Sequence, residues 1–489
     1  MGTSRRFLLA DLLSIWLAIF FAFPAIADTS DVSVSGRSLA QPVERDSADR
    51  LDRLTNTALS KIIDFERWYW QQRAITSKEP RWRHLRWFVM QDAAAGLFLS
   101  SQISMMREAA RGMTNPEKVS TPELRKANVC GLLGSAFEGG SSALELGSNA
   151  LIAAKNKRRG NDPATSKRIA MERLDVIDSF LAQRADLTVQ LRSSNDFPAY
   201  ECEGKLLKAC RDRCALEFAD LYGDTKAYQS SNNIYYVLDV AGCSTYVASY
   251  VLALKGLRDV RYNGPSIITA IVADVVFVPA AQVYSYSYKW LYKHSRNRFL
   301  QDAKQQDYDA HNKAREILLQ LKANSEGVTS SAAPSVAPSA TSATAKISAE
   351  LTDRLSKRLA IYELWAKTYD TFISKKQLDL NRLERVARQS NISGPAIAGA
   401  FLAADIIGLN ANYRLMHNAR ASNANVFAGG VATTLASTVD LGFTTGWYCG
   451  DLVHNHNLRK RQALPEQLIQ QRIRTADELD AIMAAKSVP

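Results

Sequence analysis

Six long segments of this chain contain no lysine or arginine, and they constrain its fold more than any other feature. Each is about 20–28 residues long, enough for a helix to cross a bilayer. Alternating strand-like patterns are missing, whereas apolar residues recur at helical spacing throughout. The sequence therefore predicts an all-α protein. The six segments lie at 87–106, 127–154, 234–254, 263–288, 392–413 and 426–453.

The six segments form three pairs, with shorter links within each pair and long charged stretches between pairs. We expect three long apolar helical hairpins, at 84–154, 233–288 and 391–453, which form a bundle. The hairpin spacing carries this expectation.

Charged, amphipathic segments precede the first hairpin and separate the others. They lie at 28–83, 155–232 and 289–390, and a helical tail follows at 454–489. In the third, Leu355, Tyr362 and Tyr369 share one heptad column, a spacing typical of coiled coils.

The segment at 289–390 is predicted to hold two antiparallel charged helices, joined by a disordered linker at 325–346. Ser, Ala, Thr and Pro dominate that linker. Only Pro279 interrupts the helical pattern from Ser266 to about Leu321, which predicts a long helix leaving the fourth apolar segment.

Residues 1–27 have the organisation of a secretory signal peptide. Arg5 and Arg6 precede an apolar stretch at 12–23, and small residues around Ala27 offer a cleavage site. An uncleaved anchor helix is the alternative. The sequence predicts export to the cell envelope.

Three cysteines cluster in the polar stretch ECEGKLLKACRDRC. Cys202, Cys210 and Cys214 have no histidine near enough to complete a familiar zinc pattern. In an oxidising compartment we expect a disulfide from Cys202 to Cys210 or Cys214.

Each apolar segment contains one or more acids, and these are the candidate functional residues. Around Asp274, nine Ile, Val and Phe residues favour membrane insertion by about 3–5 kcal/mol, and the aspartate opposes it by about 2.5–3.5 kcal/mol. Such acids either bind a cation or pass protons, or accept hydrogen bonds from neighbouring helices. The absence of basic residues inside the segments argues against ion pairing. The acids are Asp92, Glu138, Glu145, Asp239, Asp274, Asp405 and Asp440.

Aromatic residues lie beside basic ones near several segment ends. Trp68, Trp70, Trp82 and Trp290 are examples, and such residues are typical of membrane interfaces. Packing between soluble helices is the alternative interpretation.

No catalytic motif is present: the sequence contains no phosphate loop, dinucleotide fingerprint, GxSxG or HExxH pattern. His454 and His456 in DLVHNH would diverge on a helix, so no metal site is predicted, and no cofactor. Enzymatic activity stays uncertain, with a non-enzyme favoured. The net charge of +12 is spread along the helices, and an exported protein is not expected to bind nucleic acid.

The sequence favours an exported, envelope-associated protein that crosses a membrane several times. A scaffold, assembly or transport-associated role fits best, with membrane lipid, a second copy or an envelope protein as partner. Two alternatives remain open: a soluble exported helical bundle that acts as a structural or interaction protein, and a membrane-inserting or pore-forming protein.

Overall fold

The computed structural model describes residues 47–76, 81–192, 196–305, 309–326, 349–413 and 417–485. Every regular element within these residues is helical, which confirms the all-α prediction. The predicted signal peptide lies outside the described residues, as does nearly all of the predicted linker at 325–346.

The helices vary widely in length, and two of them reach 60 residues or more. Short 3₁₀ turns η1 (Pro116–Lys118) and η2 (Val260–Tyr262) join helices at two places. The helices are α2 (Ser47–Thr76), α3 (Arg81–Thr114), α4 (Thr121–Arg158), α5 (Pro163–Gln190), α6 (Phe197–Gly256), α7 (Asn263–Phe277), α8 (Ala280–Asp302), α9 (Ala310–Glu326), α10 (Ala349–Tyr413), α11 (Ala419–Lys460) and α12 (Pro465–Ala485).

The break between α4 and α5 follows from its sequence. Gly160 has a φ of 69°, in the left-handed region that glycine adopts without steric cost. The next amide, of Asn161, donates to the carbonyl of Asn156 at 2.9 Å and so closes the end of α4. Asp162 then caps α5, since its carboxylate accepts from the amides of Ala164 and Thr165.

The predicted helix does continue out of the fourth apolar segment, as α8, but the helical run from Ser266 to about Leu321 is more divided than expected. It is divided at Pro279, between α7 and α8, and again after Asp302. At the second break Lys304 has a φ of 51°, and the amide of Gln305 donates to the carbonyl of Leu300 at 2.9 Å. This is a left-handed helix end formed without glycine, so no residue type announces it in the sequence.

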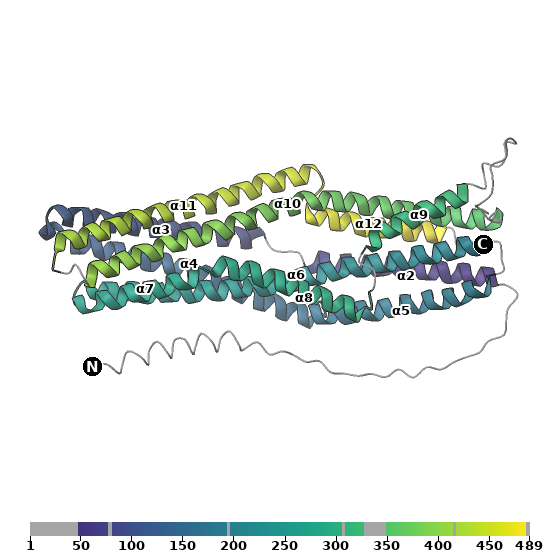
Figure 1. Ribbon diagram of the computed structural model, residues 1–489, viewed down its shortest axis with the longest axis horizontal. Coiled ribbons are helices and arrows are strands. Elements are labelled where there is room, and N and C mark those ends of the chain that lie inside the picture. Colours follow the sequence, from purple (N-terminus) through teal and green to yellow (C-terminus); the bar gives the residue numbers. More distant parts are fainter. Residues whose placement is uncertain are drawn as a thin grey trace, which may run out of the picture. The chain divides into compact units, whose positions relative to one another are not determined.

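Six helices pack as a closed ring, which we call the apolar bundle. Around it, α3 contacts α4, α4 contacts α6, α6 contacts α7, α7 contacts α10, α10 contacts α11, and α11 contacts α3 again. From α6 and α10 only residues 234–256 and 392–413 belong to it. Figure 1 shows these segments running alongside one another.

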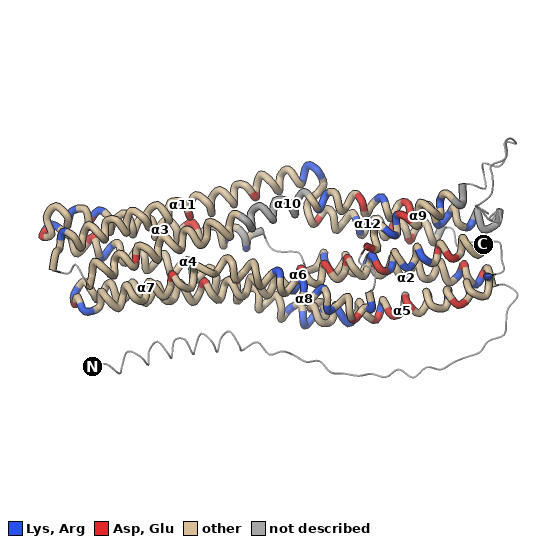
Figure 2. The backbone as a smooth tube through the Cα atoms, in the orientation of Figure 1, with Lys and Arg blue, Asp and Glu red and all other residues tan. Residues whose placement is uncertain are grey.

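The remaining helices form a second region, the charged bundle. It comprises α2, α5, α9 and α12 with 197–233 of α6, the end of α8 and the first part of α10. Figure 2 shows that Lys, Arg, Asp and Glu gather along these helices and are sparse along the apolar bundle. Its core is that of a water-soluble protein, with Leu59, Ile62 and Trp365 fully buried.

The aromatic residues divide between two environments. Trp70 is buried in the core of the charged bundle, and Trp68 packs against that core. These two residues therefore pack between helices and do not mark a membrane interface. Trp82 and Trp290 are exposed. Tyr362 and Tyr369, from the predicted heptad column, are buried.

In the apolar bundle, small and polar side chains lie inside and large apolar side chains lie outside, the reverse of the charged bundle. The buried residues of the apolar bundle are mostly Gly, Ala, Ser, Thr and Asp, and the large aliphatic ones among the described residues are Leu238, Val276 and, near the end of α11, Leu458. Large aliphatic and aromatic side chains point outward. Those exposed on α3, α4, α7 and α11 include Val89, Ile103, Leu133, Phe137, Leu144, Leu151, Ile268, Val272, Val275, Leu435, Val439 and Leu452.

Four helical stretches in the described residues are long and apolar enough to cross a membrane. They are Phe197–Gly256, Val260–Asp302, Gln389–Tyr413 and Ala419–Ala484. The first two apolar segments, in α3 and α4, do not reach this hydropathy. Polar residues such as Gln91, Glu138 and Glu145 lower their average.

Candidate functional site: carboxylates inside the apolar bundle

One face of α6 carries the polar side chains that organise the interior of the apolar bundle. Asp239, Cys243, Tyr246 and Tyr250 follow at spacings of four, three and four residues, which places them on one side of a helix. This face turns toward other helices of the ring, because the acids of those helices meet it. The polar face spans about 17 Å along the helix axis.

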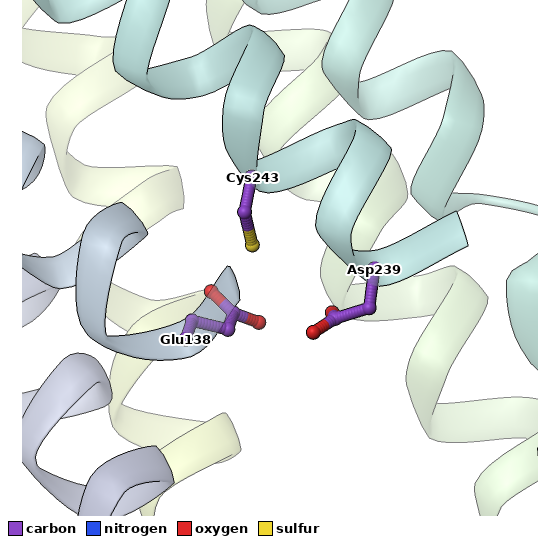
Figure 3. A group of neighbouring side chains, drawn as sticks. All are labelled: Glu138, Asp239 and Cys243. Atoms are coloured by element: carbon purple, nitrogen blue, oxygen red, sulfur yellow. The ribbon is translucent and has the colours of Figure 1, made fainter. Parts of the chain in front are cut away.

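The first cluster joins α6 to α4. Glu138, Asp239 and Cys243 each offer one donor atom, and these atoms all lie within 4.8 Å of one another. Figure 3 shows the two carboxylates and the thiol pointing toward one another. Ser142, one turn beyond Glu138 on α4, donates to Oδ2 of Asp239 at 2.5 Å.

Close helix packing brings these side chains together. A Cβ atom at Gly139 would lie 2.7 Å from the Cβ of Cys243, far inside contact distance. Only glycine therefore permits α4 and α6 to approach so closely at this level. Small residues have this role in membrane bundles, where helix backbones pack tightly.

The second cluster joins α6 to α7 and α10. Asp274 is 1% exposed, and the hydroxyl of Tyr246 donates to its Oδ1. Its Oδ2 has no hydrogen-bond partner in the described part of the chain. Asp405 approaches Asp274 from α10, so two carboxyl groups adjoin inside the ring.

The remaining acids have other surroundings. Asp92 of α3 accepts from the Thr445 hydroxyl of α11 at 3.3 Å. Asp440, also on α11, lies within electrostatic range of Asp92 and of Glu138. These two are partly exposed at the contact of α3 with α11, and the structure does not bring all the predicted acids into one cavity.

Glu145 is ion-paired, although the absence of lysine and arginine from the apolar segments argued against ion pairs. Arg83 and Arg86 both contact its carboxylate, the latter at 2.5 Å, and Glu145 is 3% exposed. The arginines lie just before the first apolar segment, on α3, and reach across to α4. Inspection of each segment alone could not reveal partners from its neighbour.

The three clustered cysteines are free thiols in place of the predicted disulfide. All three lie on α6, a single unbroken helix. Cys202 is eight residues from Cys210, about 12 Å along the axis, which exceeds disulfide reach. Cys210 and Cys214 are instead buried in the core of the charged bundle.

Sequence reasoning missed Cys243, Ser142 and Tyr246 as members of the site. Cys243 reads as a small buried hydrophobic residue when it is considered alone. The available signal was spacing, since Cys243 and Tyr246 follow Asp239 by four and seven residues. Ser142 likewise follows Glu138 by four.

Chemically, the interior offers oxygen and sulfur donors without basic partners. No lysine or arginine forms an ion pair with Glu138, Asp239, Asp274 or Asp405 within the residues that the structure describes. Carboxylates so placed hold cations or protons. Comparisons with protein-family models, with curated proteins and with solved structures find no match to this chain.

Proposed function

We propose that this protein is an integral membrane protein of the cell envelope whose apolar bundle spans the bilayer and whose charged bundle stands in water. In this role the buried carboxylates accept a cation or protons, which makes the protein transport-associated. The proposal rests on one observation: in the apolar bundle, large apolar side chains face outward and small or polar ones face inward.

That distribution is unfavourable in water. Removing each outward Val, Leu, Ile or Phe side chain from water would lower the free energy by about 1 kcal/mol. A soluble bundle places such residues inside, as the charged bundle does around Leu59 and Ile62. An apolar surface this extensive marks a membrane or a partner.

The interior is also what a membrane requires. Small residues such as Gly139, Gly429 and Ser142 let helix backbones approach closely, which supports association where apolar burial gives little drive. Ionisable residues in spanning helices face the bundle interior. Asp239 and Asp274 do so, at 4% and 1% exposure.

Placement in the envelope rests on the sequence of residues 1–27, which predicts export. N-terminal sequencing of the purified protein tests it: a mature chain beginning near Asp28 supports cleavage, and a chain beginning at Met1 contradicts it.

Two matched cysteine substitutions test the membrane assignment. Leu435 on α11 and Leu319 on α9 are equally exposed, at 62% and 61%, but lie in the apolar and the charged bundle respectively. In a background with the six native cysteines replaced by serine, and in open membrane fragments that expose both surfaces, a hydrophilic maleimide should label Leu319→Cys and spare Leu435→Cys. Equal labelling would reject the spanning bundle.

Carbonate washing of the same membranes provides an independent measurement. A protein with several spanning helices stays in the pellet, and release into the supernatant would favour a soluble bundle instead.

A further inference from the structure

We propose that Glu138, Asp239 and Cys243 form a binding site for a divalent transition-metal ion of the zinc type. The inference rests on the proposed function, because it names the cation class that the interior of the apolar bundle receives.

The three donors converge from two helices. Asp239 and Cys243 lie one turn apart on α6, and Glu138 faces them from α4 (Figure 3). Ligands bound tetrahedrally to zinc at 2.0–2.3 Å lie about 3.3–3.8 Å from one another. The donor atoms already lie within 4.8 Å of one another, so each pair is at most about 1.5 Å beyond the separation that a tetrahedral site requires.

A second observation points to a ligand at this place. Asp239 is 4% exposed, and its Oδ2 accepts from Ser142. Ser142 is the hydrogen-bond donor that the described residues supply to this carboxylate, and the carboxylate is directed toward Glu138. A buried carboxylate in this state is costly unless a cation or a proton satisfies it.

The donor set selects the class of ion. Two carboxylates alone would suit calcium or magnesium, which prefer oxygen ligands. A thiolate from Cys243 shifts the preference toward zinc and its neighbours in the first transition series. Three protein ligands leave one position open, and Asp440 of α11 lies within electrostatic range to approach it.

Proton balance and orientation follow from the same geometry. Binding converts the Cys243 thiol to a thiolate and displaces any proton held by the carboxyl groups of Glu138 and Asp239, and the released protons pass to the solvent. Ser142 is a positioning residue, because its hydrogen bond to Oδ2 fixes the orientation of the Asp239 carboxylate.

Cobalt substitution tests the site in the full-length protein purified in detergent. One equivalent of Co²⁺ should produce thiolate-to-cobalt charge-transfer absorption in the near ultraviolet, and Zn²⁺ should displace it. Cys243→Ser should abolish the band. Cys130→Ser, on the neighbouring helix α4, should retain it and serves as the matched control.

Affinity measurements distinguish the residues that bind the metal from the residue that positions one of them. Ser142→Ala should weaken Co²⁺ binding roughly 10-fold while the charge-transfer band keeps its position. Asp239→Asn, which preserves shape, should weaken binding by more than Ser142→Ala does.

Two results would overturn the site: a band that persists in Cys243→Ser, or no band in wild-type protein that is helical by circular dichroism. Carbonate washing of the membranes from which the protein is purified keeps the two proposals distinguishable. A protein that resists washing but binds no Co²⁺ refutes the metal site alone, and one that binds Co²⁺ but is released refutes the membrane assignment alone.

Discussion

Ser142 on α4 donates a hydrogen bond to Asp239 on α6, across 97 positions of sequence and at 2.5 Å. Beside this contact lie Glu138, Gly139 and Ser141 of α4 and Cys243 of α6. Specific polar contacts and close backbone packing, in place of large apolar side chains, hold α4 against α6.

The glycine at this contact should be sensitive to enlargement. In Gly139→Ala the new methyl group would meet the Cβ of Cys243 at 2.7 Å, and we expect the unfolding free energy to fall by about 1–3 kcal/mol. In Gly147→Ala, on the same helix, nothing lies within 4 Å, and stability should rise by up to about 1 kcal/mol. Thermal denaturation in detergent compares the two, and equal effects would contradict the close contact.

Removal of one partner from the buried ion pairs of the charged bundle should be strongly destabilising. Arg358 contacts Glu203 at 2.6 Å and Asp52 at 3.0 Å, and Glu203 is fully buried. Arg358→Met leaves Glu203 with Arg184 at 3.5 Å and Asp52 with Arg354 at 2.5 Å, so we expect a loss at the lower end of the range for a broken buried pair, about 3 kcal/mol.

The surface pair of Arg168 with Glu172 is the control, since both side chains are more than half exposed. Arg168→Met should change stability by less than about 0.5 kcal/mol. Chemical denaturation measures both variants, and a similar small loss in each would show that the Arg358 pairs contribute little.

Asp162 should make the stability of α5 depend on pH in the acid range. Hydrogen bonds from the Thr165 hydroxyl and from two backbone amides outweigh slight burial and lower its pKa below 3.8. A group with a lowered folded-state pKa stabilises fully above its unfolded pKa, so this contribution is lost as pH falls below about 4.

Two substitutions separate the charge of Asp162 from its capping. Asp162→Asn retains an N-cap but should remove this pH dependence, and Asp162→Ala should lose about 1 kcal/mol at neutral pH. Denaturation followed between pH 3 and pH 7 is the measurement. An unchanged pH profile in Asp162→Asn would assign the dependence to other groups.

Asp274 should be more important for transport than for folding. Asp274→Asn keeps an acceptor oxygen for Tyr246 and removes a charge whose second oxygen has no partner among the described residues. We expect thermal stability to be maintained or raised, and cation- or proton-coupled flux in proteoliposomes to be lost. Glu117→Gln, in the exposed turn η1, should leave flux unchanged. Full flux in Asp274→Asn would remove this residue from the proposed pathway.

The helical spacing of apolar residues was sufficient to predict the helix content. The burial of Asp239 and Asp274 was also predictable, because an acid within an apolar helix is stabilised when it faces the interior of the bundle. It could not show which acids adjoin. The meeting of Asp274 with Asp405, or of Glu138 with Cys243, depends on which helices are neighbours in the ring and on their rotation about their own axes. The ion pair of Glu145 with Arg83 could not be predicted for the same reason.

Helix ends show a similar limit. The break at Pro279 follows from the residue itself, since proline has no amide hydrogen to continue the helix. The end of α8 near Lys304 depends on a backbone conformation that lysine rarely adopts, and no local pattern predicts it.

Two helices run through both bundles, and they differ in one respect. α6 continues without interruption from Phe197 to Gly256, whereas α10 contains Pro395 near its entry to the apolar bundle. A proline removes one main-chain hydrogen bond and weakens a helix locally against bending. A change in the angle between the bundles would therefore be absorbed more readily at Pro395 than anywhere along the uninterrupted α6.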